Sequence, residues 1–238
     1  MRIGDVLLVT GQGKVSTALV TAQKALYQRA VSSHVAFCLG DGCFVHATGD
    51  SGVHLVFITE ELKNCEPEWR AIRLKGITDE QEDRLVAAGL YYLRQGYNKG
   101  FMGAGTDHSS FCSELVAKIY EKAGIPILSN RSPSKVAPAH FDLEADSQTD
   151  WEDVTEEYKA TLAEIEKDPR LYHIAFSTIQ AAMARRHVFS QGREQIFNWM
   201  LQEADRNGDR QKRAMVEEMK ETLRKQRSLH FWDEHDQD

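Results

Sequence analysis

The feature that most constrains the fold is a pair of short apolar runs joined by a glycine-rich turn. The runs His34–Leu39 and Cys43–Ala47 are separated by Gly40-Asp41-Gly42, and glycine permits the positive φ angles that a tight turn demands. We therefore predict a β-hairpin with a three-residue turn over 40–42. Such a hairpin implies an antiparallel sheet around it.

The predicted register brings two histidines to one face of this hairpin. A three-residue turn pairs Leu39 with Cys43. Ala36 then pairs with His46, and the two-residue period of a strand puts His34 and His46 on the same face, with Cα atoms about 7 to 8 Å apart. His34 is thus a candidate general base. His46 is the candidate partner that fixes its tautomer and stabilises the imidazolium.

A candidate nucleophile lies at the start of a predicted helix. The Gly-rich segment 96–110 leads into a helical stripe that ends near Gly124. Cys112 therefore lies at or near a helix N-terminus, where the helix dipole and an imidazolium lower the thiol pKa below about 8.5. Free backbone N–H groups there can also form an oxyanion hole. The alternative is that Cys112 only packs the first turn of a buried helix.

The remaining patterns divide the chain into two parts. Strands are predicted at 5–10, 53–58 and 69–74, an amphipathic helix at 15–26, and another helix from a capping box at Thr78 towards Gly96. After about Asp150 the chain is polar, charged and helix-periodic, with apolar patterns over 171–179, 196–201 and 215–223. We therefore predict an α+β catalytic domain over residues 1–140 and a helical C-terminal extension over residues 150–238.

Composition and charge exclude several classes of protein. The chain has 29 Lys and Arg against 36 Asp and Glu, a net charge of −7, which is opposite to that of a nucleic-acid binder. The N-terminus lacks the apolar core of a signal peptide, and no stretch approaches the roughly 18 apolar residues of a membrane span. We predict a chain made in the cytoplasm without a signal peptide and without stable membrane insertion. Export by a signal-independent system stays open.

The cysteines and histidines leave a metal site as an alternative. The four cysteines, at positions 38, 43, 65 and 112, form no compact zinc spacing or disulfide framework. His34, His46 and Cys112, with His108, would make a tetrahedral zinc set. That set would leave no catalytic base, and we predict neither a metal nor a cofactor.

At these residues the chain resembles the circularly permuted branch of the NlpC/P60 papain-like superfamily, in which the histidine strands precede the cysteine helix. The resemblance covers about residues 3–125. Its parts are segments 4–8 (GDVLL), 33–36 (SHVA), 41–47 (DGCFVHA) and 111–116 (FCSELV). It implies a papain-like core with Cys112 as nucleophile, His34 as base and His46 as the third polar residue. It also implies that Tyr97, within Gly96-Tyr97-Asn98, helps to line the oxyanion or substrate site.

The resemblance also bears on the activity. Lecithin:retinol acyltransferase-like members typically carry Asn-Cys-Glu, whereas this chain has Phe111-Cys112-Ser113-Glu114, which favours the bacterial amidase-like branch. Some bacterial members are antibacterial toxins delivered by type VI secretion. The resemblance therefore implies a cysteine hydrolase of the amidase or peptidase type that cleaves an amide or ester bond through a Cys112 acyl-enzyme. Peptidoglycan stem peptide is the favoured substrate, and an immunity or secretion protein is a candidate partner.

Two further hypotheses stay open. The first is a hydrolase or acyltransferase that acts on lipid or thioester acyl groups. The second is a non-catalytic binding module, in which a papain-like scaffold presents the charged C-terminal helices to a partner protein.

Overall fold

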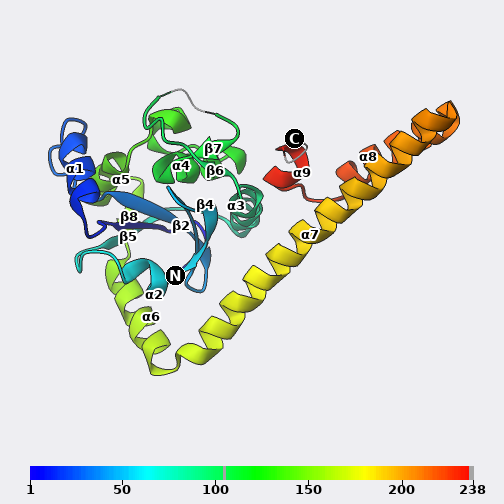
Figure 1. Cartoon of the computed structure of the whole chain (residues 1–238). Helices are drawn as coiled ribbons and strands as arrows, with labels where there is room; N and C mark the ends of the chain where they lie inside the picture. Colours follow the sequence, from blue (N-terminus) through cyan, green and yellow to red (C-terminus); the bar gives the residue numbers. More distant parts are fainter. Residues whose placement is uncertain (104–105, 236–238) are drawn as a thin grey trace. The chain divides into compact units, whose positions relative to one another are not determined.

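The chain forms two compact units in the computed structural model, Met1–Phe176 and Ser177–Asp238. The structure describes residues 1–103 and 106–235. The first unit is built on a six-stranded antiparallel sheet with the strand order β4-β3-β2-β1-β5-β8 (Figure 1). These strands are β1 (Val6–Val9), β2 (His34–Gly40), β3 (Cys43–Thr48), β4 (Gly52–Phe57), β5 (Arg70–Leu74) and β8 (Trp151–Asp153).

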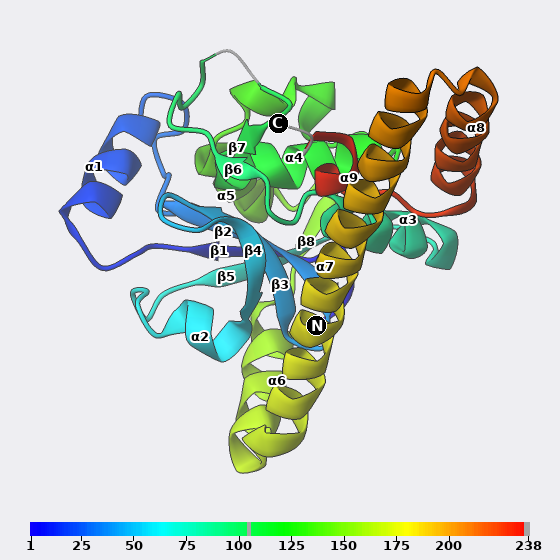
Figure 2. The same ribbon diagram turned by 45° about the vertical axis from the view of Figure 1, so that its right-hand side comes forward.

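Helices lie on both faces of this sheet, with α4 and α5 on one side and α6 on the other (Figure 2). The helices of this unit are α1 (Lys14–Gln23), α2 (Ile58–Leu62), α3 (Asp79–Tyr91), α4 (Cys112–Lys122), α5 (Pro138–Ser147) and α6 (Thr155–Lys167). The predicted capping box at the start of α3 is confirmed, because Thr78 Oγ1 accepts from Gln81 N and Gln81 Oε1 accepts from Thr78 N.

The predicted hairpin is present, but its turn is shorter than expected. Gly40 pairs with Cys43, so only Asp41 and Gly42 form the turn. Both have positive φ angles, 49° and 78°, as in the two-residue turns that match the twist of a hairpin. A register shift between Cys38 and Gly40 compensates for the missing turn residue.

Beyond this bulge the register is the predicted one. Phe37 pairs with Val45, which carries Ala36 to the position opposite His46. His34 and His46 therefore share a face of the hairpin as predicted, although the turn is shorter than predicted.

Aromatic side chains fill the two sides of the sheet. Phe37 packs edge to face on Tyr120 of α4, with ring centroids 5.8 Å apart. Phe44, whose side chain leaves the opposite face, packs on Tyr158 of α6 at 6.3 Å. Burying these large rings supplies much of the apolar area that stabilises the unit.

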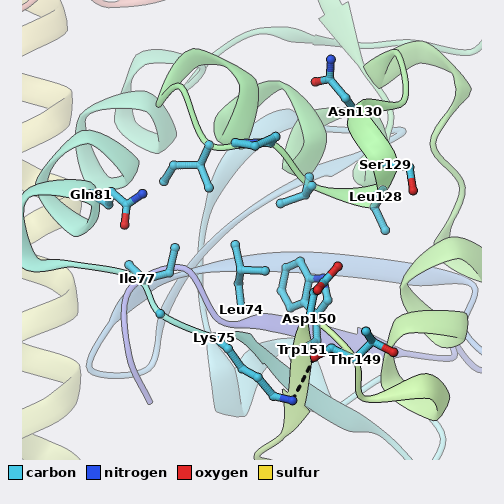
Figure 3. A pocket seen from close by; sticks show the side chains of 14 residues that line it. Leu74, Lys75, Ile77, Gln81, Leu128, Ser129, Asn130, Thr149, Asp150 and Trp151 are labelled. Atoms are coloured by element: carbon cyan, nitrogen blue, oxygen red, sulfur yellow. Dashed lines mark hydrogen bonds between the residues drawn. The ribbon is translucent and has the colours of Figure 1, made fainter.

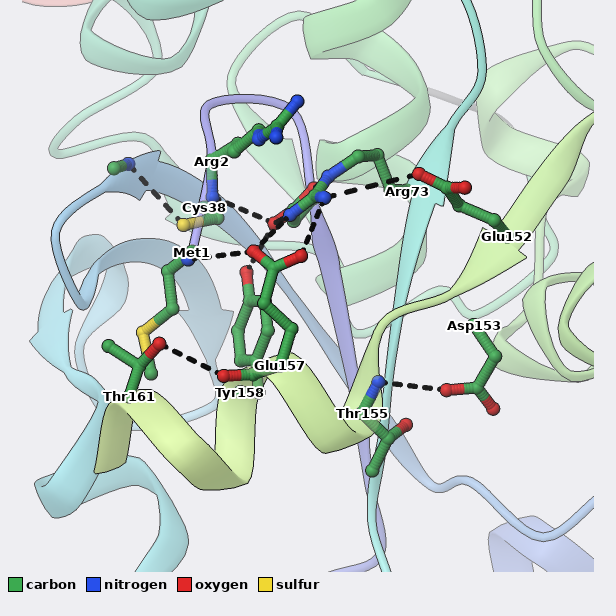
Figure 4. Close-up of polar contacts among 12 residues, drawn as sticks. Met1, Arg2, Cys38, Arg73, Glu152, Asp153, Thr155, Glu157, Tyr158 and Thr161 are labelled. Atoms are coloured by element: carbon green, nitrogen blue, oxygen red, sulfur yellow. Dashed lines mark hydrogen bonds and ion pairs between the residues drawn. The ribbon is translucent and has the colours of Figure 1, made fainter. Parts of the chain in front are cut away.

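A buried ion-pair network fastens α6 to the sheet (Figure 4). Asp5, which is fully buried, accepts from Arg73 Nε at 2.8 Å and from Arg73 Nη2 at 2.9 Å. It also accepts from the Tyr158 hydroxyl at 2.9 Å. Arg73 reaches Glu157 as well, at 2.9 Å. One network thus joins the residue just before β1 to β5 and α6.

The first unit extends past residues 140–150, where the sequence pattern placed the boundary. Trp151 pairs with Leu74 and adds β8 to the sheet, and the compact unit ends at Phe176. A strand of three residues with one apolar side chain has no periodicity to detect, so the sequence pattern gave no sign of it.

The second unit is helical, as predicted for this part of the chain. Its elements are the later part of α7 (Pro169–Asn207), α8 (Arg210–Gln226) and α9 (Phe231–His235). Two of the three predicted helical patterns lie on the single helix α7. Buried Asp233 accepts from the Ser190 hydroxyl and pairs with Arg227 at 3.0 Å. Among the described helices, none combines the length and hydropathy needed to cross a bilayer.

Candidate active site

Cys112 is the first residue of α4, as the sequence predicted, and its side chain is buried. The helix begins there because Glu114 Oε2 accepts the Phe111 backbone N–H at 3.3 Å, which satisfies one of the free donors of a helix N-terminus. The sulfur accepts the backbone N–H groups of Val35 and Ser113. These donors and the helix dipole favour a negative charge on the sulfur.

His34 hydrogen bonds to Cys112, and each side chain favours the charged form of the other. Burial raises the pKa of Cys112, but the charge and hydrogen bond of His34 outweigh it and lower the pKa below that of an ordinary thiol. Burial lowers the pKa of His34, but the charge and hydrogen bond of Cys112 and the charge of Glu61 raise it above its ordinary value. The arrangement favours a thiolate–imidazolium pair.

The opposite edge of the His34 ring faces a second histidine and a carboxylate. His34 Nε2 lies 3.1 Å from His46 Nδ1 and 3.5 Å from Glu61 Oε1. Glu61 Oε2 lies 3.0 Å from His46 Nδ1. The predicted contact between His34 and His46 is thus present, and Glu61 contacts both rings.

Glu61 remains ionised in this setting. Its side chain is only 9% exposed, and this burial raises its pKa. The hydrogen bond from His46 and the charges of His34, His46 and His54 more than offset burial and lower the pKa of Glu61 to about 2.

A third histidine continues the chain of contacts. β3 and β4 pair His46 directly with His54, and their Nε2 atoms lie 2.9 Å apart. His54 Nδ1 in turn lies 3.0 Å from the Gly52 carbonyl oxygen. A carbonyl only accepts hydrogen bonds, so His54 carries its proton on Nδ1.

Glycine is required at position 52, whose carbonyl contacts His54. Its φ is +64°, which side chains disfavour, and a Cβ there would lie 2.5 Å from the Gln95 carbonyl oxygen.

Neither Glu61 nor His54 was singled out from the sequence. His54 lies on the predicted strand 53–58. Had that strand been paired with 43–47 across the turn after Thr48, His54 would have been placed opposite His46. Glu61 lies on α2, a helix of five residues without a motif. Only the fold, in which α2 follows β4 back towards β2, brings it to the histidines.

Tyr97 lies on the short strand β6 (Gly96–Tyr97), which pairs with β7 (Ser109–Ser110) ahead of the nucleophile. Burial and the charge of Cys112 raise the pKa of Tyr97 to about 12. The tyrosine is therefore within electrostatic range of the nucleophile. Ala104 and Gly105, within the predicted Gly-rich loop 96–110, lie outside the described residues.

Buried polar contacts hold this segment against α4. Fully buried Glu114 accepts from Asn98 Nδ2 at 3.0 Å and pairs with Lys118 at 3.2 Å. Lys118 Nζ also donates to the carbonyl oxygens of Thr106 at 2.8 Å and Ser109 at 3.0 Å. Glu114 therefore has a positional role beyond its place in the helix dipole.

A buried carboxylate on α5 also fixes the entry to β2. Asp142 accepts the backbone N–H groups of Val31 and Ser32, each at 2.9 Å, and binds Arg70 Nη2 at 3.0 Å. These contacts hold the chain just ahead of His34.

The alternative zinc set of His34, His46, Cys112 and His108 is not a convergent group among the described residues. His108 is exposed. Among the described residues, the group whose ligand atoms converge is His34, His46 and Glu61.

A separate pocket lies at the far end of α4 from Cys112 (Figure 3). Leu74, Ile77, Leu128 and Trp151 supply apolar walls, and Asp150 is among the polar residues at its edge. None of the predicted site residues lines it.

The antiparallel sheet, the cysteine that opens the helix packed on it, and the histidine strands that precede this helix define a circularly permuted papain-like fold. The family model described as "permuted papain-like amidase enzyme, YaeF/YiiX, C92 family" matches residues 1–175, and the chain belongs to this family. It is therefore of the cysteine amidase or peptidase class. The resemblance and the fold class predicted from the sequence are confirmed.

Comparison with solved structures finds the metalloprotein YiiX from Escherichia coli O157:H7. The TM-score is 0.42 and the sequence identity 22%, over 51% of this chain and 66% of that chain. No curated protein matches this chain significantly.

Proposed function

We propose that the chain hydrolyses an amide bond with Cys112 as nucleophile and His34 as general base and acid. The observation that carries the proposal is the hydrogen bond between Cys112, the first residue of α4, and His34, in which each side chain favours the charged form of the other. Cysteine hydrolases need such a pair, because the thiolate is the nucleophile and the imidazolium supplies the proton to the leaving group. A buried structural cysteine has its pKa raised instead, as Cys38 has, to about 12.

The reaction follows from this geometry. The Cys112 thiolate attacks the carbonyl carbon, and free N–H groups of the first turn of α4, with Tyr97 nearby, stabilise the oxyanion. His34 donates its proton to the leaving amine as the acyl-enzyme forms. The neutral imidazole then removes a proton from the water that hydrolyses the thioester.

Glu61 and His46 together act on the base in this scheme. We infer that the carboxylate of Glu61 stabilises the imidazolium of His34, because it lies 3.5 Å from Nε2 and is itself held by His46 at 3.0 Å. His34 Nε2 faces this pair, which leaves Nδ1 for the sulfur. The orienting role that the sequence gave to His46 alone is therefore shared, and the predicted Cys-His-His triad becomes Cys112, His34 and a Glu61–His46 unit.

Peptidoglycan stem peptide remains the favoured substrate, on the family resemblance. The antibacterial effector role, the type VI export route and an immunity partner are parts of the same proposal.

A lipid or thioester acyl substrate is the second candidate, and one observation favours it. The apolar stripe of α1 is not covered by the core: Val15 is 75% exposed, and Leu26, just beyond the helix, is 47% exposed. Gly11, just ahead of α1, hydrogen bonds to Ser33 beside the base. An exposed apolar surface on α1 suits an acyl chain.

Incubation with purified peptidoglycan fragments and with phospholipids, analysed by mass spectrometry, separates these substrates. Wild type should cleave one class, Cys112→Ala should cleave neither, and the control Cys65→Ala should match wild type. Cys65 is a fair control because burial and the charge of Glu61 raise its pKa to about 12.

Turnover by Cys112→Ala would overturn the catalytic assignment. The binding-module hypothesis gains support if Cys112 reacts with a thiol reagent at neutral pH no faster than free cysteine does.

A further inference from the structure

Helix α7 carries apolar side chains on two sides within the second unit, and α8 covers one of these sides. Phe197 and Ser190 are buried there. Lys220 of α8 lies 5.8 Å from the centroid of the Phe197 ring and pairs with Glu194 at 2.8 Å. A helix whose apolar side chains extend beyond one stripe is normally buried on more than one side. The uncovered side of α7 therefore needs a partner.

This uncovered side, which we call the α7 stripe, runs over 178–199. Its members recur every three or four residues, the spacing of one side of an α-helix. Its large apolar side chains are 59% to 65% exposed. The members of the stripe are Thr178, Ala181, Arg185, Val188, Phe189, Gly192, Ile196 and Trp199.

The stripe contains a glycine that its own chain does not explain. Gly192 lies in the interior of α7, where glycine is the least favourable residue after proline. A Cβ at this position would meet no atom within 4 Å among the described residues. An isolated glycine within a helix usually has a packing reason, such as the close approach of another chain. The space beside Gly192 is therefore available to a partner.

The stripe is complementary to itself when two copies of α7 lie antiparallel. A two-fold axis between positions 188 and 189 makes the same surface face itself, as an isologous interface requires. In this register the larger side chains at each end of the stripe face small ones, which allows close packing. The facing pairs, one residue from each copy, are Thr178 with Trp199, Ala181 with Ile196, Arg185 with Gly192, and Val188 with Phe189.

The charged member of the stripe favours the antiparallel register over a parallel one. Opposite Gly192, the apolar stem of Arg185 can lie across the glycine while its guanidinium reaches solvent. A parallel, in-register pair of helices would instead place each Arg185 opposite its own copy, and like charges that face each other weaken an interface. It would also set Trp199 against Trp199.

The area of the stripe is close to that of a stable dimer interface. Phe and Trp side chains bury about 150 to 250 Å² each, and Phe189 and Trp199 are more than half exposed. With the aliphatic members, pairing along about 33 Å of helix buries on the order of 600 Å² per chain, against the ~800 Å² of a standard interface. Aromatic residues in a patch with little charge are typical of the core of such interfaces.

We propose that two copies of this chain form a dimer through the α7 stripe, with their α7 helices antiparallel over 178–199. The self-matching register, the unexplained glycine and the area together identify a second copy as the occupant. The inference concerns the second unit and is independent of the proposed hydrolase activity.

Sedimentation equilibrium of the full-length protein at micromolar concentrations measures the association. Wild type should have twice the chain mass of 27.0 kDa. Trp199→Glu should raise the dissociation constant at least about 30-fold, the loss expected for a central interface residue. Asn198→Glu is the matched control, because Asn198 is exposed on another side of the same helix, and it should dimerise as wild type does.

Gly192→Leu separates association from folding. Leucine is a much better helix former than glycine, and nothing in the described chain opposes its side chain. Circular dichroism should therefore show unchanged or higher helicity, while the dissociation constant rises at least about 10-fold because the second helix can no longer approach. A monomeric wild type, or dimers that Trp199→Glu and Gly192→Leu leave unchanged, would overturn the proposal.

Disulfide cross-linking tests the register. Ala181→Cys and Ile196→Cys are made separately in the Cys112→Ala protein, whose own cross-links give the background. Under mild oxidation the antiparallel register predicts a cross-linked dimer when the two variants are mixed, and little when either is alone. Cross-linking of each variant alone, without the mixed product, would show a parallel pair and overturn the antiparallel register.

Discussion

Glu61 Oε2 lies 3.0 Å from His46 Nδ1, in a fold where the two residues come from different elements, α2 and β3. The same carboxylate lies 3.5 Å from the ring of His34. One acid, whose side chain is 9% exposed, thus faces both histidines that the sequence singled out. We propose that this acid orients His34 and stabilises its imidazolium form.

Glu61→Gln should therefore lower kcat strongly. The amide keeps the shape of the side chain but removes the negative charge that stabilises the imidazolium of His34. We expect kcat to fall about 10²- to 10⁴-fold, the range of general acid–base contributions, with little change in KM. Glu60→Gln is the matched control in steady-state assays, and equal kcat values for the two variants would contradict the role of Glu61.

The pH dependence of Cys112 alkylation reports the thiolate–imidazolium pair. The lowered pKa of Cys112 and the raised pKa of His34 both favour the ion pair. Iodoacetamide should therefore react with Cys112 at pH values below the ordinary thiol pKa of about 8.5, and the rate should fall at lower pH as the sulfur is protonated. Turnover should also fall at high pH, where His34 loses the proton needed by the leaving group.

His34→Ala should remove this behaviour. The alkylation rate of Cys112 should then rise only towards an ordinary or higher thiol pKa, at or above about 8.5. A wild-type pH profile that matches the His34→Ala profile would show that the two residues are not coupled.

Breaking the Asp5–Arg73 pair should destabilise the first unit. Arg73→Met leaves the fully buried carboxylate of Asp5 without its cation, and loss of one partner of a buried pair costs about 3 to 5 kcal/mol. Lys159→Met on α6 removes an exposed pair with Glu156 and should cost less than about 1 kcal/mol. Urea unfolding of the two variants measures the difference, and similar midpoints would contradict the structural role of Arg73.

Acid should unfold the protein through its low-pKa carboxyl groups. The hydrogen bond and charge of Arg73 outweigh burial and lower the pKa of Glu157 to about 2, and the pKa of Glu61 is also about 2. A carboxyl group with a depressed folded pKa contributes its stability above the unfolded pKa of about 4.3 and loses it as the pH falls towards the folded value. The free energy of unfolding should therefore decline from about pH 5 to pH 2 and vary little with these groups above pH 5.

Lys118 should hold Thr106 and Ser109, which precede the nucleophile, in place. Lys118→Met removes donors to the Thr106 and Ser109 carbonyls and leaves Glu114 without its cation. We expect faster limited proteolysis near Thr106 and Ser109, and lower turnover. Lys99→Met, at an exposed position of the same segment, is the control. Unchanged proteolysis of Lys118→Met would show that the segment is held by other contacts.

Local patterns in the sequence were enough to predict the hairpin, the α3 capping box and the cysteine at the start of α4. Each depends on residues close together in the chain, whose spacing follows the period of a strand or a helix. The contact between His34 and His46 was also within reach, because a hairpin register is a local property.

The rest depends on contacts that local patterns do not encode. Glu61 reaches the histidines only through the course of the chain after β4, and Trp151 joins the sheet through a strand of three residues. The apolar stripe of α1 predicted a buried face, yet Val15 is 75% exposed, because helical periodicity shows which residues share a face but not whether anything covers it.

The most direct test of the central claim is mass spectrometry of the acyl-enzyme. Wild type is mixed with an activated ester of a short acyl peptide, quenched in acid and digested. We expect the mass of one acyl group on the peptide that contains Cys112, no such mass in Cys112→Ala, and wild-type labelling in Cys65→Ala. Turnover of this substrate by Cys112→Ala, or an acyl group that persists on another residue of that variant, would contradict the assignment of Cys112 as the nucleophile.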